Sequence, residues 1–272
     1  MKKKAVFLDI DGTLLLRDGT MPESAKEALA RATERGHEMV LCTGRSPSQL
    51  SPVMSLANFD GVVASAGAYG TRQGRLLWRE TLDGSHTKQL VDYFHENQMP
   101  YFLQTERALC SDTRSTEEIK AAFEDLGRTW DEVKALFGLM VTSEDPGATE
   151  GVEKCCYFRC RKDAAVVQRE LGSYFQVVDS SYKLTRFCDG EIMKAGVNKA
   201  TGISRYLEAA GIDREDCIAF GDGPNDIEML EYAHTGVCMG NGTDRTKAVA
   251  DLVCGRIDED GLYNAFLGLG LI

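Results

Sequence analysis

The stretch VFLDIDGTLLL, residues 6–16, places an apolar run directly before two acids, Asp9 and Asp11. A short apolar run without alternation is typical of a strand in a parallel sheet, where helices cover both faces. Ionised carboxylates at the end of such a strand are costly to bury unless a cation meets them. The stretch therefore predicts a buried parallel strand with a positively charged partner beside its carboxyl end.

The same arrangement, an apolar run followed by polar or small residues, recurs further along the chain. The runs are HEMVLC before Thr43, DGVVA before Ser65 and CIAF before Gly221. Helix signals lie between the early runs, over residues 21–36 and, for a shorter helix, over residues 46–59. Strands that alternate with helices over short connections are typical of right-handed parallel βαβ units.

The pattern changes in the middle of the chain. Residues 68–80 indicate a β-hairpin with Gly74 in its turn. From residue 84 to 186, helical segments alternate with strands of mixed polarity, which favours an antiparallel sheet with one solvated face. We therefore expect an α/β protein of two domains. A Rossmann-like parallel-sheet core would comprise residues 1–83 and 187–272, and residues 84–186 would form an inserted α+β domain.

Polar side chains follow the predicted parallel strands. Asp9 and Asp11 follow the first, Thr43 the second, Ser65 the third and Asp222 a later one. The carboxyl ends of parallel strands meet at one edge of the sheet, and open α/β sheets bind their ligands there. The sequence therefore predicts a functional site at this edge.

Charge and composition exclude several classes of partner. A net charge of −11, without a Lys/Arg-rich run, disfavours nucleic acid. No stretch approaches the roughly 20 apolar residues that cross a bilayer, and the apolar stretch after MKKK is too short for a signal peptide. Nine cysteines in such a chain suit free thiols in a reducing cytoplasm. An anionic ligand must therefore be bound by a few local cations or by a metal.

Cys155, Cys156 and Cys160 lie close together in EKCCYFRC and raise the question of a metal site. They lack the paired C-x-x-C spacing of structural zinc sites, and the alternation of the segment favours a strand. We expect these thiols to pack as small apolar side chains and to bind no stoichiometric zinc.

The residues at the sheet edge suit phosphoryl chemistry. The acids Asp9, Asp11 and Asp222 could converge on a hard cation, and magnesium, which takes oxygen ligands and is often completed by a substrate phosphate, fits best. A carboxylate such as Asp9 can act as a nucleophile that forms an aspartyl-phosphate, and Asp11 could serve as the general acid. The Thr43 hydroxyl and the Lys199 ammonium would neutralise the transferring phosphoryl group.

Each of these features also has a plain structural interpretation. A D-x-D pair at a strand end is often a turn, and in GDGPND the residues Asp222, Asn225 and Asp226 could be solvated or cap the next helix. GDGPND lacks the third glycine of a dinucleotide-binding fingerprint. Lys199 could be a surface lysine, and Thr43 could simply end a strand. The order and spacing of the whole set favour a site.

At this point a resemblance to a known family emerges. VFLDIDGTL, LCTGR, GVNK and FGDGPNDIEML resemble the four motifs of the haloacid-dehalogenase-like superfamily. EIMKAGVNK, MGNG and DEDG make the chain similar to its Cof-type (IIB) phosphatases. The resemblance covers residues 4–82 and 187–266, whereas the middle segment matches only in length and mixed pattern. It implies that residues 84–186 form a mobile cap that supplies substrate specificity.

The resemblance implies roles for the matching residues of the first two motifs. Asp9 would be the nucleophile and a metal ligand. Asp11 would be the general acid and base and would bind the metal through its backbone carbonyl. Thr43 and Gly44 would hold the phosphoryl oxygens. An acid at position 11 favours phosphate-ester chemistry over dehalogenase or transport-ATPase chemistry.

The last two motifs supply the remaining implied roles. Lys199 would bridge the phosphate and the nucleophile, and Asp222 would be a metal ligand. Asn225 would contact the substrate, and Asp226 would orient Lys199. One departure stands out, because relatives commonly carry Asn-Gly-Ala after the third strand, whereas this chain has SAGA with Ala66 at the Asn position.

The sequence therefore predicts a cytoplasmic, magnesium-dependent phosphatase that acts on small phosphorylated metabolites, with sugar phosphates as the favoured class. Neither a nucleic acid nor a membrane is an expected partner. A phosphomutase or phosphotransferase would share every core residue and differ in the acceptor of the phosphoryl group. A phospho-accepting signalling domain is disfavoured, because a receiver gains nothing from a leaving-group acid at Asp11.

Overall fold

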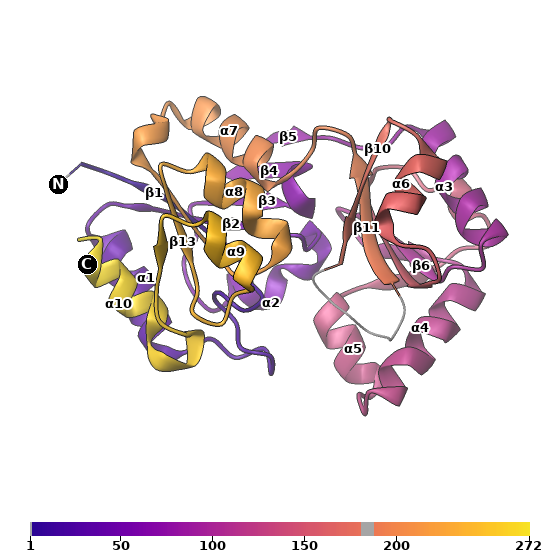
Figure 1. Ribbon diagram of the computed structural model, residues 1–272, viewed down its shortest axis with the longest axis horizontal. Helices are drawn as coiled ribbons and strands as arrows, with labels where there is room; N and C mark the ends of the chain where they lie inside the picture. The colour runs from indigo at the N-terminus through magenta and orange to yellow at the C-terminus, as the bar shows by residue number, and fades with distance from the viewer. Residues whose placement is uncertain (1, 181–187) are drawn as a thin grey trace. The chain divides into compact units, whose positions relative to one another are not determined.

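A computed structural model describes residues 2–180 and 188–272 of the chain. The chain forms two compact units (Figure 1). Unit 1 comprises the chain up to Gly44, Ser51–Arg79 and Asn198–Ile272, and unit 2 comprises Arg45–Leu50 and Glu80–Val197. The boundary between residues 186 and 187 that the sequence suggests lies outside the described residues.

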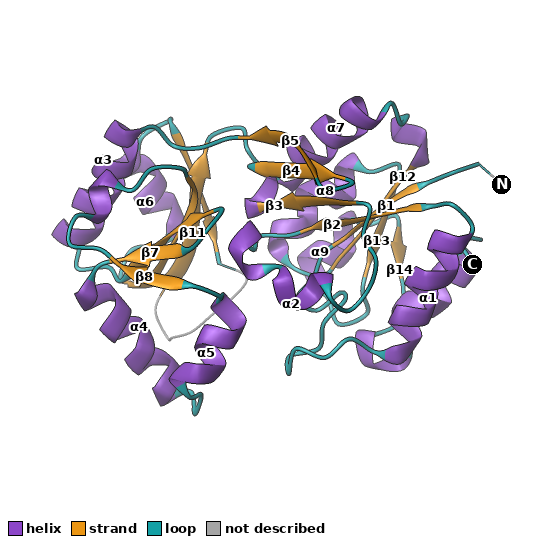
Figure 2. Cartoon of the chain, turned by 180° about the vertical axis from the view of Figure 1, so that it is seen from behind, coloured by secondary structure: helices purple, strands orange, loops and turns teal. Residues whose placement is uncertain are grey.

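Unit 1 is built on an eight-stranded sheet of order β14-β13-β12-β1-β2-β3-β4-β5 (Figure 2). The strands from β14 to β3 are parallel, as the sequence predicts, and β4 and β5 form the predicted antiparallel hairpin. The strands are β1 (Ala5–Leu8), β2 (Glu38–Cys42), β3 (Gly61–Ala64), β4 (Tyr69–Arg72), β5 (Arg75–Arg79), β12 (Cys217–Gly221), β13 (Thr235–Cys238) and β14 (Leu252–Val253).

Helices cover both faces of this sheet, which explains why its strands are apolar throughout. α7 and α8 pack on one face through Ile203, Tyr206 and Met229, while α1 and α10 pack together on the other, where Phe266 contacts Phe220. The helices of unit 1 are α1 (Glu23–Glu34), α2 (Ser51–Met54), α7 (Lys199–Ala210), α8 (Ile227–Tyr232), α9 (Asp244–Val249) and α10 (Gly261–Gly268).

The helix expected over residues 46–59 is shorter than predicted. The structure has a 3-10 turn at Pro47–Gln49, followed by the single-turn helix α2. Proline lacks a backbone N–H, so Pro52 can begin a helix but cannot continue the preceding one. The other 3-10 turns are Ser65–Gly67, Pro146–Ala148, Arg214–Asp216, Pro224–Asp226 and Ile257–Glu259.

Unit 2 contains a six-stranded sheet of order β10-β11-β9-β6-β7-β8, which is antiparallel except between β7 and β8. Its strands are β6 (Tyr101–Thr105), β7 (Leu109–Ser111), β8 (Met140–Thr142), β9 (Val152–Cys160), β10 (Phe175–Asp179) and β11 (Cys188–Lys194). Its helices are α3 (Gly84–Glu96), α4 (Thr113–Asp125), α5 (Trp130–Phe137) and α6 (Ala164–Leu171).

The prediction of one solvated face for this sheet is wrong, because both faces carry hydrophobic side chains. Phe94 of α3 and Val167 of α6 pack on one face, and Phe123 of α4 and Val133 of α5 pack on the other. The alternation in the sequence therefore separates two cores rather than a core from solvent.

The cysteines of EKCCYFRC lie on strand β9, as the pattern predicts. Cys155 and Cys160 belong to the cluster beneath α3 and α6, whereas Cys156 belongs to the cluster beneath α4 and α5. A positive φ of 55° at Arg159 marks the irregularity that brings Cys160 to the same face as Cys155. The adjacent thiols Cys155 and Cys156 therefore point to opposite faces of the sheet.

An ion pair fixes the first residue of β2 in the core of unit 1. Glu38 is 2% exposed, and Arg72 of β4 donates to its two oxygens over 2.8 and 3.0 Å. The Tyr206 hydroxyl of α7 donates to the same carboxylate over 2.6 Å. Burial alone would raise the pKa of Glu38, but these hydrogen bonds lower it below its usual value. The network thus links two strands to the helix that carries Lys199.

Replacing Glu38 by Ala should lower the free energy of unfolding by about 3 kcal/mol, because it leaves a partly buried guanidinium without its partner. Urea denaturation followed by Trp78 fluorescence, in a Trp130→Phe background, would report on unit 1. Glu23→Ala, which breaks an exposed ion pair with Lys26, is the matched control and should cost under about 0.5 kcal/mol. Equal losses in the two variants would contradict a structural role for the network.

Candidate active site

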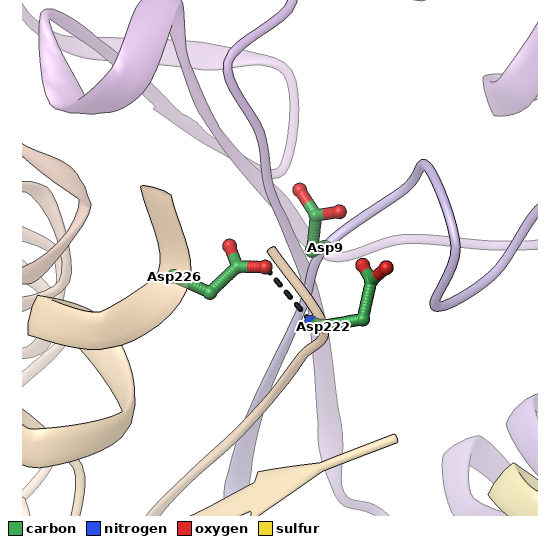
Figure 3. A group of neighbouring side chains, drawn as sticks. All are labelled: Asp9, Asp222 and Asp226. Atoms are coloured by element: carbon green, nitrogen blue, oxygen red, sulfur yellow. Dashed lines mark hydrogen bonds between the residues drawn. The ribbon is translucent and has the colours of Figure 1, made fainter. Parts of the chain in front are cut away.

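The nucleophile expected from the sequence lies directly beyond β1. The Asp9 backbone N–H donates to the Phe220 carbonyl of β12 over 3.0 Å, so the strand pairing extends to this residue. Asp222 follows β12, and the two parallel strands end side by side. In Figure 3 the carboxylates of Asp9 and Asp222 point to the same side, while Asp226 reaches toward them from a neighbouring turn. The pairing of β1 with β12 therefore brings together acids that are 213 positions apart (222 − 9).

Lys199, the first residue of α7, lies between two of these acids. Its Nζ atom donates to Asp9 Oδ1 over 2.6 Å and to Asp226 Oδ1 over 2.5 Å, and its side chain is 1% exposed. Asn198 precedes it and caps the helix by accepting from the Thr201 backbone N–H. Lys199 is therefore a buried ammonium that is fixed by the start of a helix, not a surface lysine.

Asp226 uses both of its carboxylate oxygens within the protein. Oδ1 accepts from Lys199, and Oδ2 accepts from the backbone N–H groups of Asp222 and Gly223 over 2.9 and 2.8 Å. Asp226 therefore pairs with Lys199 and also binds the backbone of the loop after β12. It is poorly suited to bind a metal, because a cation would compete with these donors.

Carboxylate oxygens of Asp9, Asp222 and Asp226 lie within 4.8 Å of one another, and the Lys199 ammonium pairs with Asp9 and Asp226. Burial and the neighbouring Asp226 raise the pKa of Asp9 well above its usual value and that of Asp222 to about 7. Burial alone would favour a neutral Lys199, but Asp226 and Asp9 raise the pKa of its ammonium well above the usual range.

This charge balance fits a divalent cation. Burial and the nearby Asp226 disfavour the ionised forms of Asp9 and Asp222, and a cation beside them would favour those forms. Clustered carboxylate oxygens are the donors that hard cations such as magnesium prefer. The acidic cluster is therefore compatible with a metal site, in which Asp9 and Asp222 are the carboxylates not saturated by backbone donors.

The structure places the Asp11 side chain outside this carboxylate cluster. Asp11 lies in a loop of residues 10–15, hereafter the Asp11 loop, in which the Leu14 and Leu15 N–H groups donate to the Ile10 carbonyl. The side chain of Asp11 is exposed, because the loop carries it beyond the strand end. Of the three acids grouped from the sequence, the structure therefore brings together the carboxylates of Asp9 and Asp222, and Asp226 completes the cluster.

The phosphoryl-binding candidates lie on the neighbouring strand. Leu8 of β1 pairs with Leu41 of β2, so Thr43 lies just beyond the partner of Asp9. Thr43 is 1% exposed; its N–H donates to the Val63 carbonyl and its carbonyl accepts from Ala66 N–H. Gly44 follows it and ends the first segment of unit 1.

Two other positions singled out in the sequence lie in turns. Asn225 is half-buried in the turn Pro224–Asp226, next to Gly223. Ala66 has φ 53° and ψ 34°, a left-handed conformation that Asn and Gly adopt more readily than Ala. The chain therefore has Ala, without a polar side chain, at a left-handed position where the family resemblance leads us to expect Asn.

Some contacts of this site were missed by the sequence reasoning. Thr13 Oγ1 donates to Asp222 Oδ1 over 3.4 Å, and Asn241 Nδ2 donates to the Gly12 carbonyl over 2.8 Å. The only signal for Asn241 was the short motif MGNG. A local pattern does not reveal a bond that joins residues 229 positions apart.

Comparisons with known proteins agree with this geometry. Residues 6–266 match the family model of haloacid dehalogenase-like hydrolases. The chain is 28% identical to the 5-amino-6-(5-phospho-D-ribitylamino)uracil phosphatase YitU of Bacillus subtilis, over 96% of this chain and 95% of that protein. It is 27% identical to the pyridoxal phosphate phosphatase YbhA of Escherichia coli, over 96% and 97% of the two chains.

The solved structures agree as well. The subclass IIB sugar phosphatase BT4131 matches with a TM-score of 0.82 and 26% identity, over 99% of this chain and 100% of that one. In the part of the chain that the structure describes, no helix is long and apolar enough to cross a membrane. The chain therefore belongs to the haloacid dehalogenase-like hydrolases, in their Cof-type (IIB) branch.

Proposed function

We propose that the protein is a magnesium-dependent phosphatase that hydrolyses monoesters of small phosphorylated metabolites through an aspartyl-phosphate on Asp9. The observation that carries this proposal is the position of the Asp9 carboxylate. It lies at the carboxyl end of the central strand, with Lys199 on one oxygen and Asp222 beside it. Named relatives that are phosphatases of pyridoxal phosphate and of a phosphorylated ribitylaminouracil support the same class of substrate.

The chemistry follows from the roles of the residues. An Asp9 oxygen attacks phosphorus and forms a new O–P bond, while the bond from phosphorus to the ester oxygen breaks. Asp11 gives its proton to that leaving oxygen and then takes a proton from the water that hydrolyses the aspartyl-phosphate. Inorganic phosphate leaves, and the Asp9 carboxylate is regenerated. Lys199, Thr43 and Gly44 stabilise the phosphoryl oxygens, and Asn225 contacts the substrate.

Asp9, Asp222 and the backbone carbonyl of Asp11 are the groups that we propose to hold magnesium. The ion would neutralise charge on the phosphoryl group. Because Asp226 accepts three hydrogen bonds from Lys199 and the backbone, we assign it the positioning of Lys199 instead. The cytoplasm is the compartment that we propose, since all nine cysteines are free thiols.

We propose that the inserted domain, residues 84–186, acts as a cap that selects the substrate. Apart from Asn225, the core residues assigned above act on the phosphoryl group and the ester oxygen, which all monoesters share, so most discrimination must come from elsewhere. Unit 2 has polar side chains in the middle of its sheet: Gln104 on β6, Lys154 on β9 and Glu191 on β11, which are 3%, 1% and 6% exposed. Charged side chains as buried as Lys154 and Glu191 are unusual in proteins.

The charge balance among Gln104, Lys154 and Glu191 favours a substrate whose part beyond the phosphate is neutral. Lys154 pairs with Glu191 over 2.8 Å, so its charge is balanced and does not call for a second phosphate. Gln104 Nε2 contacts Cys156 Sγ, and Gln104 Oε1 has no hydrogen-bond partner among the residues that the structure describes. A hydroxyl or N–H of the substrate would satisfy that oxygen. We therefore favour sugar phosphates and similar monoesters of neutral, polar alcohols.

Phosphate release from a panel of phosphorylated metabolites, with magnesium present, tests the proposed function. We expect turnover of at least one sugar phosphate or related monoester, and release of inorganic phosphate to water. Transfer to a second hydroxyl without phosphate release would identify a phosphotransferase or mutase instead. A single burst of product without further turnover would identify a phospho-accepting domain.

Gln104→Leu should change selectivity without harming the core chemistry. A substrate hydroxyl that loses its acceptor should reduce kcat/KM for the best metabolite by about tenfold or more. Turnover of p-nitrophenyl phosphate, which offers no such hydroxyl, should change by less than about threefold. That limit corresponds to about 0.65 kcal/mol of activation free energy. Gln89→Leu makes the same change on α3, across the sheet, and should leave both rates as in the parent. Parallel losses on both esters in Gln104→Leu would contradict a role in selectivity.

A further inference from the structure

The side chain of Asn241, from a distant part of the chain, donates a hydrogen bond to the Asp11 loop. Asn241 lies between β13 and α9, and its Nδ2 donates to the Gly12 carbonyl over 2.8 Å. Its Oδ1 accepts the Ile257 backbone N–H over 2.9 Å. These two partners fix the orientation of the amide, because the reversed amide would face a carbonyl with its oxygen and an N–H with its nitrogen.

Gly12 is the point at which the loop meets the acidic cluster. Its φ of 89° lies in the left-handed region, and a Cβ atom built on it would lie 2.2 Å from Asp222 Oδ2. The backbone of Gly12 therefore lies directly against the Asp222 carboxylate. The bond from Asn241 acts on the residue between Asp11 and Thr13, and Thr13 itself donates to Asp222.

The segment that carries Asn241 is itself tied to the end of β12. The Met239 N–H donates to the Gly221 carbonyl over 2.9 Å, and the Thr243 N–H donates to the Asp222 carbonyl over 3.1 Å. Asn241 thus connects the Asp11 loop to the backbone that positions Asp222. A shift of the loop would displace the Asp11 carboxyl relative to Asp9, and a displacement of about 1 Å can cost about 10²-fold in rate.

We propose that Asn241 is a positioning residue that fixes the Asp11 loop, so that Asp11 can protonate the leaving oxygen and present its carbonyl to the metal. This inference rests on the proposed function, because it assumes the roles of Asp9 and Asp11. Under this proposal, Asn241 of the MGNG motif contributes to the reaction by positioning the general acid. Asn241 acts through Gly12 and does not contact the substrate.

The requirement for a general acid depends on the leaving group, which provides a test. p-Nitrophenolate leaves without a proton, whereas phenolate, the much stronger base, gains from one. The ratio of kcat/KM for p-nitrophenyl phosphate to that for phenyl phosphate therefore reports on Asp11. We expect Asn241→Ala to widen this ratio by about tenfold. This is less than the full effect of losing a general acid, about 10²–10⁴-fold, because Asp11 is still present but misplaced. Asp11→Asn should widen it at least as much.

Two further variants sharpen the experiment. Asn241→Asp keeps the acceptor for Ile257 and loses only the donor to the Gly12 carbonyl. It therefore isolates the contribution of the bond to Gly12, and it should widen the ratio as Asn241→Ala does. Asp251→Ala is the matched control. It also removes one hydrogen bond between a side chain and a backbone group, because the Gly236 N–H, at the other end of β13, donates to Asp251 over 2.8 Å. Its ratio should equal that of the parent.

Metal binding gives a readout that is independent of activity. The magnesium concentration that produces half of the rise in Tm should increase about tenfold in Asn241→Ala and Asn241→Asp, because groups that orient metal ligands typically contribute 10–100-fold to affinity. Asp251→Ala should retain the parent value.

The outcomes separate the two proposals. An inactive parent, or an active Asp9→Asn variant, would overturn the proposed function. An active parent in which Asp11→Asn widens the ratio while both Asn241 variants keep the parent ratio and the parent magnesium dependence would overturn the role of Asn241 alone. Folded Asn241 variants that lose both esters equally would likewise overturn it, since a purely structural role predicts that result.

Discussion

Asp9→Asn is expected to abolish turnover while leaving the fold intact. The amide keeps the shape of the side chain but is a poor nucleophile, and losing the nucleophile of a covalent mechanism typically costs on the order of 10⁵-fold or more in kcat. Asp11→Asn should cost about 10²–10⁴-fold, the range of general acid–base catalysis. Initial rates with p-nitrophenyl phosphate and far-ultraviolet circular dichroism measure the two effects separately.

The fold should tolerate the Asp9 substitution for an electrostatic reason. Burial and Asp226 raise the pKa of Asp9, so its ionised form is disfavoured in the folded protein without a metal. A neutral Asn removes both the cost of burying the charge and its repulsion by Asp226. The Tm without magnesium should therefore stay the same or rise. Asp18→Asn, the same change at an exposed loop residue, is the control and should keep the parent rate. Parent-level turnover in Asp9→Asn would rule out the covalent mechanism.

Removing magnesium is expected to have a comparably large effect. Excess chelator should lower the rate by more than about 10²-fold, because a metal ion contributes several kcal/mol of charge stabilisation in such sites. Added magnesium should restore the rate. Calcium should inhibit, since its larger and more flexible coordination shell would misplace the nucleophile and the phosphate. Rates with sodium chloride at matched ionic strength separate specific binding from screening.

Binding can be followed without turnover. Magnesium should raise Tm, since a ligand that binds only the folded state stabilises it, and Asp222→Asn should weaken this rise. Undiminished turnover in excess chelator would contradict the metal site. Retention of the full magnesium-induced rise in Asp222→Asn would contradict the assignment of Asp222 as a ligand.

Much of the site could be predicted from residues that follow strands. Asp9, Thr43 and Asp222 each come directly after an apolar run, and the carboxyl ends of parallel strands necessarily meet at one edge. Strand order alone then places them near one another, without knowledge of side-chain geometry. The hairpin around Gly74 was predictable for a similar reason, because its turn and strands are contiguous in the sequence.

Other features depended on packing that local patterns do not encode. Alternation along the strands of unit 2 indicated a solvated face, but a helix pair covers each face, so the pattern separates two cores. The helix expected over residues 46–59 was interrupted by Pro52, whose missing N–H outweighs the apolar periodicity.

The sequence by itself determined the parallel core and the strand-end acids, because apolar runs form strands and their ends carry the polar residues. The pairing of Lys199 with those acids came only as what the family resemblance implies. Only the tertiary structure decided which carboxylates gather, that Asp226 is saturated by Lys199 and two backbone N–H groups, and that Asn241 holds the Asp11 loop. The bonds from Lys199 and Asn241 join residues that are 27 and 229 positions apart, and no local pattern specifies such contacts.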